Sequence, residues 1–436
     1  MSIKKVAILG SGVMGAQLAA MFANYNIKSL LFDLNKELSN KAIDNLKKIS
    51  PPPFKIDANI NLIKGCSYKE DIHELITIDW IIEAVVENIE IKVAVYKKII
   101  KHLKPSAIIS SNTSGISLER LIKNLPNSIK ERFLISHFFN PPRYMYLLEL
   151  VKGPLTSKTT YKTISTFGKK ILHKKIVHAK DTPNFIGNRI GIFSLMNTIN
   201  KAIYKNLSPS MVDQLTGLIT SRSKSATFRT ADIIGLDTLK NVSLTTYNLV
   251  AQDESRLTYR IPPIINKLIN QNHLGQKTKC GFYKKENDKI LTLDLKNFDY
   301  QEQDDSQKDY FLRLSKMKNI KDRISYIKND SHYLSIFFWE ISRDLFLYSS
   351  NRIPEISNDI INIDNAMKWG FSWGIGPFEI WDLFGLEYSF KRMNEEKAYP
   401  PKWINIMIEK GIQKFYNKKN GKRNYWCIID QKFKRY

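Results

Sequence analysis

A histidine, an asparagine and a glutamate stand close together in one stretch of this chain, and their side chains can take part in proton transfer. Asn140 follows His137 by three residues, and Glu149 follows it by twelve. A neutral imidazole accepts a proton near pH 7, and a nearby carboxylate can orient the ring and stabilise its charged form. Taken alone, the stretch is better explained as two strands of a sheet with a buried histidine. The surrounding elements decide between the two interpretations.

A glycine-rich turn near the start of the chain indicates a site for a dinucleotide. Residues 3–9 form a β-branched run typical of a buried strand, and residues 16–25 are expected to be helical. Between them lies Gly10-x-Gly12-x-x-Gly15. Gly10 permits the tight turn, Gly12 lets the backbone approach a pyrophosphate, and Gly15 lets the helix pack close to the strand. The helix then directs its positive end at the phosphates.

An acidic residue at the end of the second expected strand indicates which dinucleotide is bound. Residues 29–32 form this strand, and Asp33 ends it, 23 residues after Gly10. A carboxylate at this place accepts hydrogen bonds from the ribose hydroxyls and repels a 2′-phosphate. The sequence therefore predicts NAD rather than NADP.

Polar side chains follow two further expected strands at the points where they end. Residues 107–109 lead into a polar cluster that contains Asn112 and Ser114, and residues 133–136 lead into His137. An open α/β sheet binds its ligands at the carboxyl ends of its strands. The alternative for Asn112 and Ser114 is capping of the next helix. The histidine is therefore expected beside the nucleotide site.

The charge of the chain gives little support to nucleic-acid binding. The 436 residues are enough for two or three domains. Lys and Arg outnumber Asp and Glu by 67 to 42, and the net charge of +25 can indicate a polyanionic partner. The basic residues are spread along the whole chain without a basic arm or an arginine-rich run. We expect no nucleic-acid partner, and a contribution of this charge to attracting an anionic substrate.

The cysteines and the apolar segments indicate in which cellular compartment the protein is expected. Cys66, Cys280 and Cys427 have no disulfide or metal-ligand spacing, so we expect no metal and a reducing, cytoplasmic environment. The apolar run 6–23 follows two lysines, as in a signal peptide, but it contains the three glycines of the phosphate turn. No other run approaches the ~20 apolar residues of a membrane span, so no integral membrane association is expected.

The second half of the chain has a helical period. Apolar faces recur from Asn184 to about Asn272, and again over residues 322–413. Residues 286–319 are polar and are expected to form a linker with a short strand or two. Residues 415–436 are basic and aromatic. Two helical units in one chain could pair with each other.

Several motifs along the chain resemble those of a known family. The first group comprises Gly10-x-Gly12-x-x-Gly15 and the segments 87–92, 111–114, 137–141 and 181–189. The second group comprises the segments 224–232, 274–278, 281–283, 366–371 and 376–379. With them the chain closely resembles the 3-hydroxyacyl-CoA dehydrogenases of fatty-acid β-oxidation. It is similar to the bacterial multifunctional members, in which two dehydrogenase C-terminal units precede an enoyl-CoA hydratase domain.

The resemblance implies a fold and an order of domains. The fold is an α/β Rossmann-type NAD-binding domain followed by two mostly α-helical dehydrogenase C-terminal domains. The implied bounds are 1–181 for the NAD-binding domain, 182–285 for the first helical domain, 286–321 for a linker, 322–413 for the second helical domain and 414–436 for a basic tail.

The resemblance also implies an activity and its residues. The activity is NAD-dependent oxidation of (S)-3-hydroxyacyl-CoA to 3-oxoacyl-CoA. His137 is implied as the base, Glu149 as its partner, Asn188 as an active-site amide and Ser114 as a substrate contact. The implied cofactor contacts are Gly10, Gly12, Gly15, Asp33, Glu87, Lys92, Ser114, Asn140 and Lys277.

Some features depart from the family pattern. Lys279 and Cys280 stand where the family usually has a glycine and a polar residue. No motif of a hydratase domain was found in this sequence, so a separate hydratase chain is an expected partner beside the acyl-CoA substrate. The alternatives are a dehydrogenase for another 3-hydroxy acid, and a catalytically weak remnant that binds NAD or a partner chain. Intact His137, Glu149 and Asn188 argue against a remnant.

Overall fold

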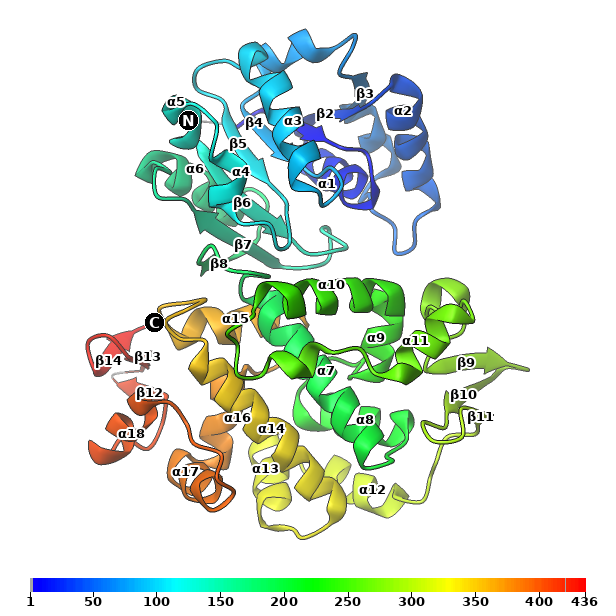
Figure 1. Ribbon diagram of the computed structural model, residues 1–436, viewed down its shortest axis with the longest axis vertical. Coiled ribbons are helices and arrows are strands. Elements are labelled where there is room, and N and C mark those ends of the chain that lie inside the picture. Colours follow the sequence, from blue (N-terminus) through cyan, green and yellow to red (C-terminus); the bar gives the residue numbers. More distant parts are fainter. Residues whose placement is uncertain (1–2, 420) are drawn as a thin grey trace. The chain divides into compact units, whose positions relative to one another are not determined.

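The computed structural model describes residues 3–419 and 421–436. The chain divides into two compact units, a first unit Met1–Phe185 and a second unit Ile186–Tyr436. The first unit contains a large sheet, whereas the second is built mainly from helices (Figure 1). The expected class, a Rossmann-type domain followed by helical C-terminal parts, is confirmed. The expected bounds of the individual helical domains stay a prediction.

The first unit is organised around one eight-stranded sheet. Its spatial order is β3-β2-β1-β4-β5-β6-β7-β8. The strands are β1 (Lys5–Leu9), β2 (Lys28–Asp33), β3 (Ile63–Ser67), β4 (Trp80–Glu83), β5 (Ile108–Ser111), β6 (Phe133–Phe138), β7 (Leu147–Lys152) and β8 (Lys175–Ala179). The first six are parallel, β7 runs antiparallel to β6, and β8 runs parallel to β7. This is the sheet of a dinucleotide-binding fold extended by two strands.

Helices cover both faces of this sheet because successive strand residues point to opposite sides. The helices are α1 (Val13–Ala23), α2 (Lys36–Asn45), α3 (Ile89–Ile99), α4 (Leu118–Ile122), α5 (Asn127–Lys130) and α6 (Lys158–Lys170). In β1, Val6 and Ile8 pack into the core formed with α1, α2 and α6. Ala7 and Leu9 pack into the opposite core, formed with α3 and α4. Burial on both faces explains the nearly continuous apolar sequence of β1.

The second unit contains two series of helices, each of which ends in a small antiparallel sheet. The first series is α7 (Gly187–Tyr204), α8 (Pro209–Leu215), α9 (Phe228–Ile234), α10 (Leu236–Leu249) and α11 (Pro263–Asn270), and then β9 (Tyr283–Glu286), β10 (Lys289–Leu293) and β11 (Tyr300–Gln301). After α12 (Lys308–Lys316) and α13 (Ile320–Asn329), the second series is α14 (Tyr333–Asn351), α15 (Ile360–Gly370), α16 (Pro377–Phe384), α17 (Leu386–Glu395) and α18 (Lys402–Glu409), and then β12 (Tyr416–Lys419), β13 (Lys422–Cys427) and β14 (Lys432–Arg435). We call α7 to β11 the first repeat and α14 to β14 the second repeat.

Matching hydrogen bonds show that the two series are repeats of one structure. In the first repeat, Asp213 accepts hydrogen bonds from the Phe228 N–H at 2.7 Å and from the Tyr283 hydroxyl at 2.8 Å. In the second repeat, Asp364 accepts from the Phe378 N–H at 2.8 Å and from the Tyr416 hydroxyl at 2.7 Å. In both repeats a tyrosine of the first sheet strand therefore ties the sheet to the helix that carries the aspartate.

A second aspartate closes each repeat in the same way. Asp232 accepts hydrogen bonds from the backbone N–H groups of Phe282 and Tyr283, at 2.9 and 3.0 Å. Asp382 accepts from the backbone at positions 415 and 416, at 2.7 and 3.0 Å. Strands β12, β13 and β14 lie within the residues expected as a basic tail, 414–436, and form the closing sheet of the second repeat, shown in red in Figure 1.

The two repeats pack on each other within the second unit. The Phe193 ring on α7 stacks on the Tyr348 ring on α14, with centroids 3.8 Å apart and an interplanar angle of 7°. Gly191 on α7 lies against Phe371, and a Cβ at this position would lie 2.0 Å from the ring. Among the helices formed by the described residues, none combines the length and the apolar character needed to cross a membrane.

Candidate active site and cofactor loop

The three glycines of the turn after β1 meet three different steric requirements. Gly10 has a φ of +100°, and a Cβ there would lie 2.7 Å from the Ala84 carbonyl oxygen. A Cβ at Gly15 would lie 1.8 Å from the Gly10 carbonyl oxygen. Around the Cβ direction of Gly12, the amino-terminal cap of α1, none of the described atoms lies within 4 Å. The open side of the loop is therefore at Gly12, where a phosphate can approach the backbone.

The start of α1 has the properties of an anion site. The first backbone N–H groups of a helix have no partner within the helix and carry a partial positive charge. None of the described side chains caps this end, and no acidic residue stands in the first turn of α1. A pyrophosphate fits this position, because it supplies acceptors for these N–H groups.

Asp33 lies beside the glycine loop at the end of β2. One of its oxygens, Oδ2, accepts hydrogen bonds from the Ser11 N–H at 2.8 Å and the Ser11 hydroxyl at 2.5 Å. The other, Oδ1, accepts from the Leu34 N–H at 2.7 Å. These bonds fix the carboxylate next to the turn. The arrangement fits the adenosine ribose of NAD, which offers hydroxyl donors.

The register of the sheet brings the expected site segments of the first unit to one edge. Leu9 of β1 pairs with Glu83 of β4, Glu83 with Ser111 of β5, and Ser111 with Ile135 of β6. The glycine loop, the segment with Glu87, the segment with Ser114 and the end of β6 all follow this row. His137 lies two residues beyond the row. The structure therefore gathers these segments at the carboxyl edge of the sheet.

His137 and Glu149 form a buried pair. They are register partners on the antiparallel strands β6 and β7, and the distance from His137 Nδ1 to Glu149 Oε2 is 2.7 Å. Their side chains are 6% and 0% exposed. The rings of Phe139 and Phe185 lie 4.7 and 5.6 Å from the imidazole. The pair is thus held at a strand end in apolar surroundings, with Nδ1 engaged by the carboxylate.

The polar residues Asn112 and Ser114, which follow β5, make different hydrogen bonds. Asn112 accepts a hydrogen bond from the Phe138 N–H at 2.9 Å and so holds β6 next to His137. The cap of α4 is Ser117, so the capping alternative for Asn112 and Ser114 is wrong. The Ser114 N–H donates to Glu87 at 2.9 Å, and Asn140 is exposed in the loop after β6.

Glu87 and Lys92, both implied as cofactor contacts, belong to a buried ionic network. The Lys92 amine is 1% exposed and lies 2.6 Å from Glu83 and 3.2 Å from Glu87. Burial acts to raise the pKa of Glu87, but the charge of Lys92 and hydrogen bonds from Thr113 and Ser114 bring it below its ordinary value. The network therefore keeps Glu87 ionised beside Ser114.

Glu83 is a member of this network that sequence reasoning missed. Its fully buried carboxylate also accepts hydrogen bonds from the Tyr96 and Ser111 hydroxyls, each at 2.6 Å. The one available sequence signal was a charged residue inside the apolar run of β4. Such a residue needs a buried partner of opposite charge, and Lys92 is that partner.

Two implied site residues lie in the second unit. Asn188 is the second residue of α7 and is half-buried. Lys277 lies in the short helical turn Gln276–Thr278, and its amine binds both oxygens of Asp237 at 2.6 Å. Their roles toward NAD and substrate stay predictions.

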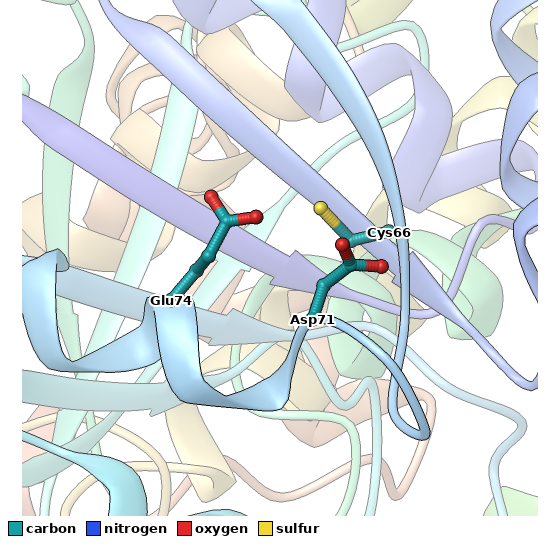
Figure 2. A group of neighbouring side chains, drawn as sticks. All are labelled: Cys66, Asp71 and Glu74. Atoms are coloured by element: carbon teal, nitrogen blue, oxygen red, sulfur yellow. The ribbon is translucent and has the colours of Figure 1, made fainter.

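One cluster in the first unit has side chains of metal-binding type. Cys66, Asp71 and Glu74 place their ligand atoms within 4.8 Å of one another (Figure 2). Lys36 pairs with Asp71 at 3.2 Å, and Lys64 pairs with Glu74 at 2.5 Å. Burial raises the pKa of Cys66 to about 12, so the thiol is protonated at neutral pH. These lysines already neutralise the carboxylates, and the cluster is a poor metal site.

The fold and the loop are those of a dinucleotide-dependent dehydrogenase, and comparison with known proteins identifies the family. The family model "3-hydroxyacyl-CoA dehydrogenase, NAD binding domain" matches residues 5–182. The model "3-hydroxyacyl-CoA dehydrogenase, C-terminal domain" matches residues 185–285. The chain belongs to the 3-hydroxyacyl-CoA dehydrogenase family, whose members are NAD-dependent oxidoreductases.

Individual relatives agree with this family. The chain is 38% identical over 445 residues to a probable 3-hydroxyacyl-CoA dehydrogenase of Bacillus subtilis, a match that covers 97% of this chain and 56% of the relative. It is 37% identical over 393 residues to a putative fatty acid oxidation complex trifunctional enzyme of Rickettsia felis, covering 87% and 53%. The chain thus spans about half the length of these curated relatives.

A solved structure has a similar fold. The 3-hydroxybutyryl-CoA dehydrogenase of Escherichia coli K12 superposes with a TM-score of 0.69 at 20% identity, covering 94% of this chain and 100% of that one. At this identity the likeness concerns the fold alone. It extends beyond the residues matched by the two family models.

Proposed function

We propose that this protein oxidises (S)-3-hydroxyacyl-CoA thioesters to 3-oxoacyl-CoA with NAD, in fatty-acid β-oxidation. The observation that carries the proposal is the buried His137–Glu149 pair, at the sheet edge that also holds the glycine loop. Oxidation of a secondary alcohol requires a base for the hydroxyl proton beside a hydride acceptor. The first unit supplies the base and the loop for the cofactor.

In this proposal His137 takes the proton of the substrate 3-hydroxyl group. Glu149 holds Nδ1, so the proton arrives at Nε2 and the imidazolium forms next to a carboxylate. This contact fixes the tautomer and stabilises the charge that develops on the ring. Bound NAD supplies the acceptor for the hydride that leaves C3 of the substrate.

The remaining site residues have positioning roles in the proposal. The Ser114 hydroxyl and the Asn188 amide hold the reacting oxygens of the substrate. Asp33 binds the ribose, the N–H groups after Gly12 bind the pyrophosphate, and Asn140 contacts the nicotinamide side. Glu87, Lys92 and Lys277 complete the cofactor site. The buried network around Lys92 supports this assignment, because it fixes the backbone that carries Ser114.

The chemistry also indicates the enzyme class that supplies the substrate. A 3-hydroxyacyl thioester forms when water adds to a 2-enoyl thioester, so we propose an enoyl-CoA hydratase as the functional partner. The relative named a fatty acid oxidation complex trifunctional enzyme supports this pairing.

Turnover of acyl-CoA substrates by the purified full chain tests the proposal. NADH absorbance is followed after NAD is mixed with short, medium and long (S)-3-hydroxyacyl-CoA, and NAD binding is measured separately. We expect NADH with at least one chain length. NAD binding without turnover at any chain length contradicts the proposal and supports a remnant that binds only NAD or a partner.

A further inference from the structure

Arg222 is a buried cation without a carboxylate partner. It lies in the loop between α8 and α9, and only 5% of the residue is exposed to solvent. Within residues 3–419 and 421–436 its guanidinium makes no ion pair, and its Nε atom has no hydrogen-bond partner. The hydrogen bond that it does make, from Nη1 to the Ser194 hydroxyl, is long at 3.4 Å. Burial lowers the pKa of Arg222 to about 10, so the group stays charged at pH 7.

Aromatic rings compensate for only part of this charge. The guanidinium carbon lies 4.5 Å from the centroid of Trp373 and 6.0 Å from that of Phe338. A ring face attracts the cation, but a guanidinium also has five N–H donors that need acceptors. A buried charge with unfilled donors is unstable unless a counter-charge lies beside it.

A small cavity lies beside this guanidinium. The lining residues with polar side-chain atoms are Arg222, Ser194, Ser223, Thr227, Thr230 and Trp373. The lining contains no acidic residue among those that the structure describes. The cavity has room for a single particle of about the size of a water molecule.

The hydroxyls of this cavity include a free donor. The Thr216 hydroxyl donates to the Val212 carbonyl, so the Thr227 hydroxyl is the donor in its hydrogen bond with Thr216. The Thr230 hydroxyl donates to the Ala226 carbonyl. The Ser194 oxygen accepts from Arg222, which leaves its O–H for a further acceptor. The cavity thus offers a full positive charge and at least one hydroxyl donor to whatever fills it.

The cavity lies where the two repeats meet. Ser194 comes from α7 and Arg222 from the following loop, whereas Phe371 and Trp373 come from the second repeat. The Gly374 N–H also donates to the Ser221 carbonyl at 2.6 Å, which ties the two segments together. A particle in the cavity would therefore contact both repeats.

We propose that the Arg222 cavity is a binding site for a monatomic, monovalent anion such as chloride, which links the two repeats. The anion neutralises the guanidinium and accepts from Nε and from Ser194. A water molecule fits the space but leaves the charge uncompensated, and oxyanions such as phosphate exceed the space. This site is independent of the dehydrogenase activity, because it involves none of the residues assigned to proton transfer or to NAD.

Thermal unfolding of the full chain at constant ionic strength tests this site. Sodium chloride is replaced by sodium gluconate, whose anion is too large for the cavity. At about ten times the dissociation constant, chloride should raise the melting temperature by about 1.5–3 °C. Arg222→Met keeps an unbranched apolar side chain but removes the guanidinium and its charge, and should abolish the difference. Arg229→Met alters an exposed arginine of the neighbouring helix α9 and should retain it.

A second measurement does not depend on the variant. Crystals of the unaltered protein soaked in bromide should show an anomalous peak within hydrogen-bonding distance of Arg222 Nε. Equal melting temperatures in both salts, a chloride response that persists in Arg222→Met, or a cavity without an anomalous peak would each overturn the proposal. If Arg222→Met fails to fold, the bromide peak decides.

Discussion

His137 Nδ1 lies 2.7 Å from Glu149 Oε2, on adjacent antiparallel strands whose pairing places the two residues opposite each other. The carboxylate is fully buried, so it interacts with the imidazole through a medium of low polarity. Its contribution to proton transfer follows from its charge as well as from its hydrogen bond.

Glu149→Gln tests the contribution of the charge. Glutamine is of nearly the same size and can still accept a hydrogen bond from Nδ1–H, but it cannot stabilise an imidazolium by charge. We expect kcat to fall by about 10²-fold or more, within the range of general acid–base effects. The affinity for NAD should stay the same. Glu119→Gln, at an exposed carboxylate, serves as the control, and a Glu149→Gln enzyme with full kcat would contradict the pairing role.

Two substitutions in the glycine loop should separate an effect on NAD binding from an effect on folding. Gly12→Ala places a methyl group in open space at the start of α1, so the protein should fold with normal stability and bind NAD much more weakly. Gly15→Ala places a methyl group 1.8 Å from the Gly10 carbonyl oxygen and should destabilise the first unit by about 1–3 kcal/mol or more. Calorimetric titration with NAD and chemical denaturation check the two outcomes. Unchanged NAD affinity in Gly12→Ala would argue against phosphate binding at this loop.

The buried Lys92 network predicts a strong coupling between two residues. Lys92→Met leaves Glu83 buried without a counter-charge and should cost about 3–5 kcal/mol of stability. The double variant Glu83→Gln, Lys92→Met removes both charges and should be more stable than the single Lys92→Met variant. Urea denaturation of the four proteins of this cycle measures the coupling. Additive effects of the two substitutions would contradict an ionic interaction.

The aspartates that close the two repeats predict a pH dependence of stability. Burial raises the pKa of Asp232 to about 7, although hydrogen bonds from Phe282 and Tyr283 oppose this rise. The folded state therefore holds the proton more tightly than the unfolded state. The resulting stabilisation is complete below the ordinary pKa of 3.8 and is lost as the pH rises through about 7.

Asp232→Asn should reduce this pH dependence. Between pH 5 and pH 8 the unaltered protein should lose on the order of 1–3 kcal/mol of unfolding free energy through this group, and the variant should lose less. Asp237→Asn is the matched control, because the Lys277 pair lowers the pKa of that exposed carboxyl despite the opposing effect of desolvation. Equal pH slopes in the protein and in Asp232→Asn would refute the assignment.

Features fixed by local sequence could be predicted, and features fixed by distant contacts could not. The glycine loop and Asp33 depend on a strand, a turn and a helix that follow one another directly, so their spacing was sufficient. The position of His137 at the end of a strand could be predicted in the same way, whereas its role as the base came from the family resemblance and stays a prediction. The ionic partner of Lys92 was missed because Glu83 looked like part of an apolar strand.

The closing sheet of the second repeat shows the same limit. Tyr416 bonds Asp364, which lies 52 residues earlier in the chain. A basic and aromatic composition alone does not reveal that contact, so residues 414–436 resembled a tail. The matching hydrogen bond between Tyr283 and Asp213 reveals the relationship when the two repeats are compared.

The central claim is that His137 takes the substrate proton, and His137→Gln tests it most directly. NADH formation by the unaltered protein and by this variant is measured with one (S)-3-hydroxyacyl-CoA at saturating NAD, and NAD affinity is measured in parallel. The account predicts a loss of at least about 10²-fold in kcat with unchanged NAD affinity. Turnover of His137→Gln at the rate of the unaltered protein would contradict it.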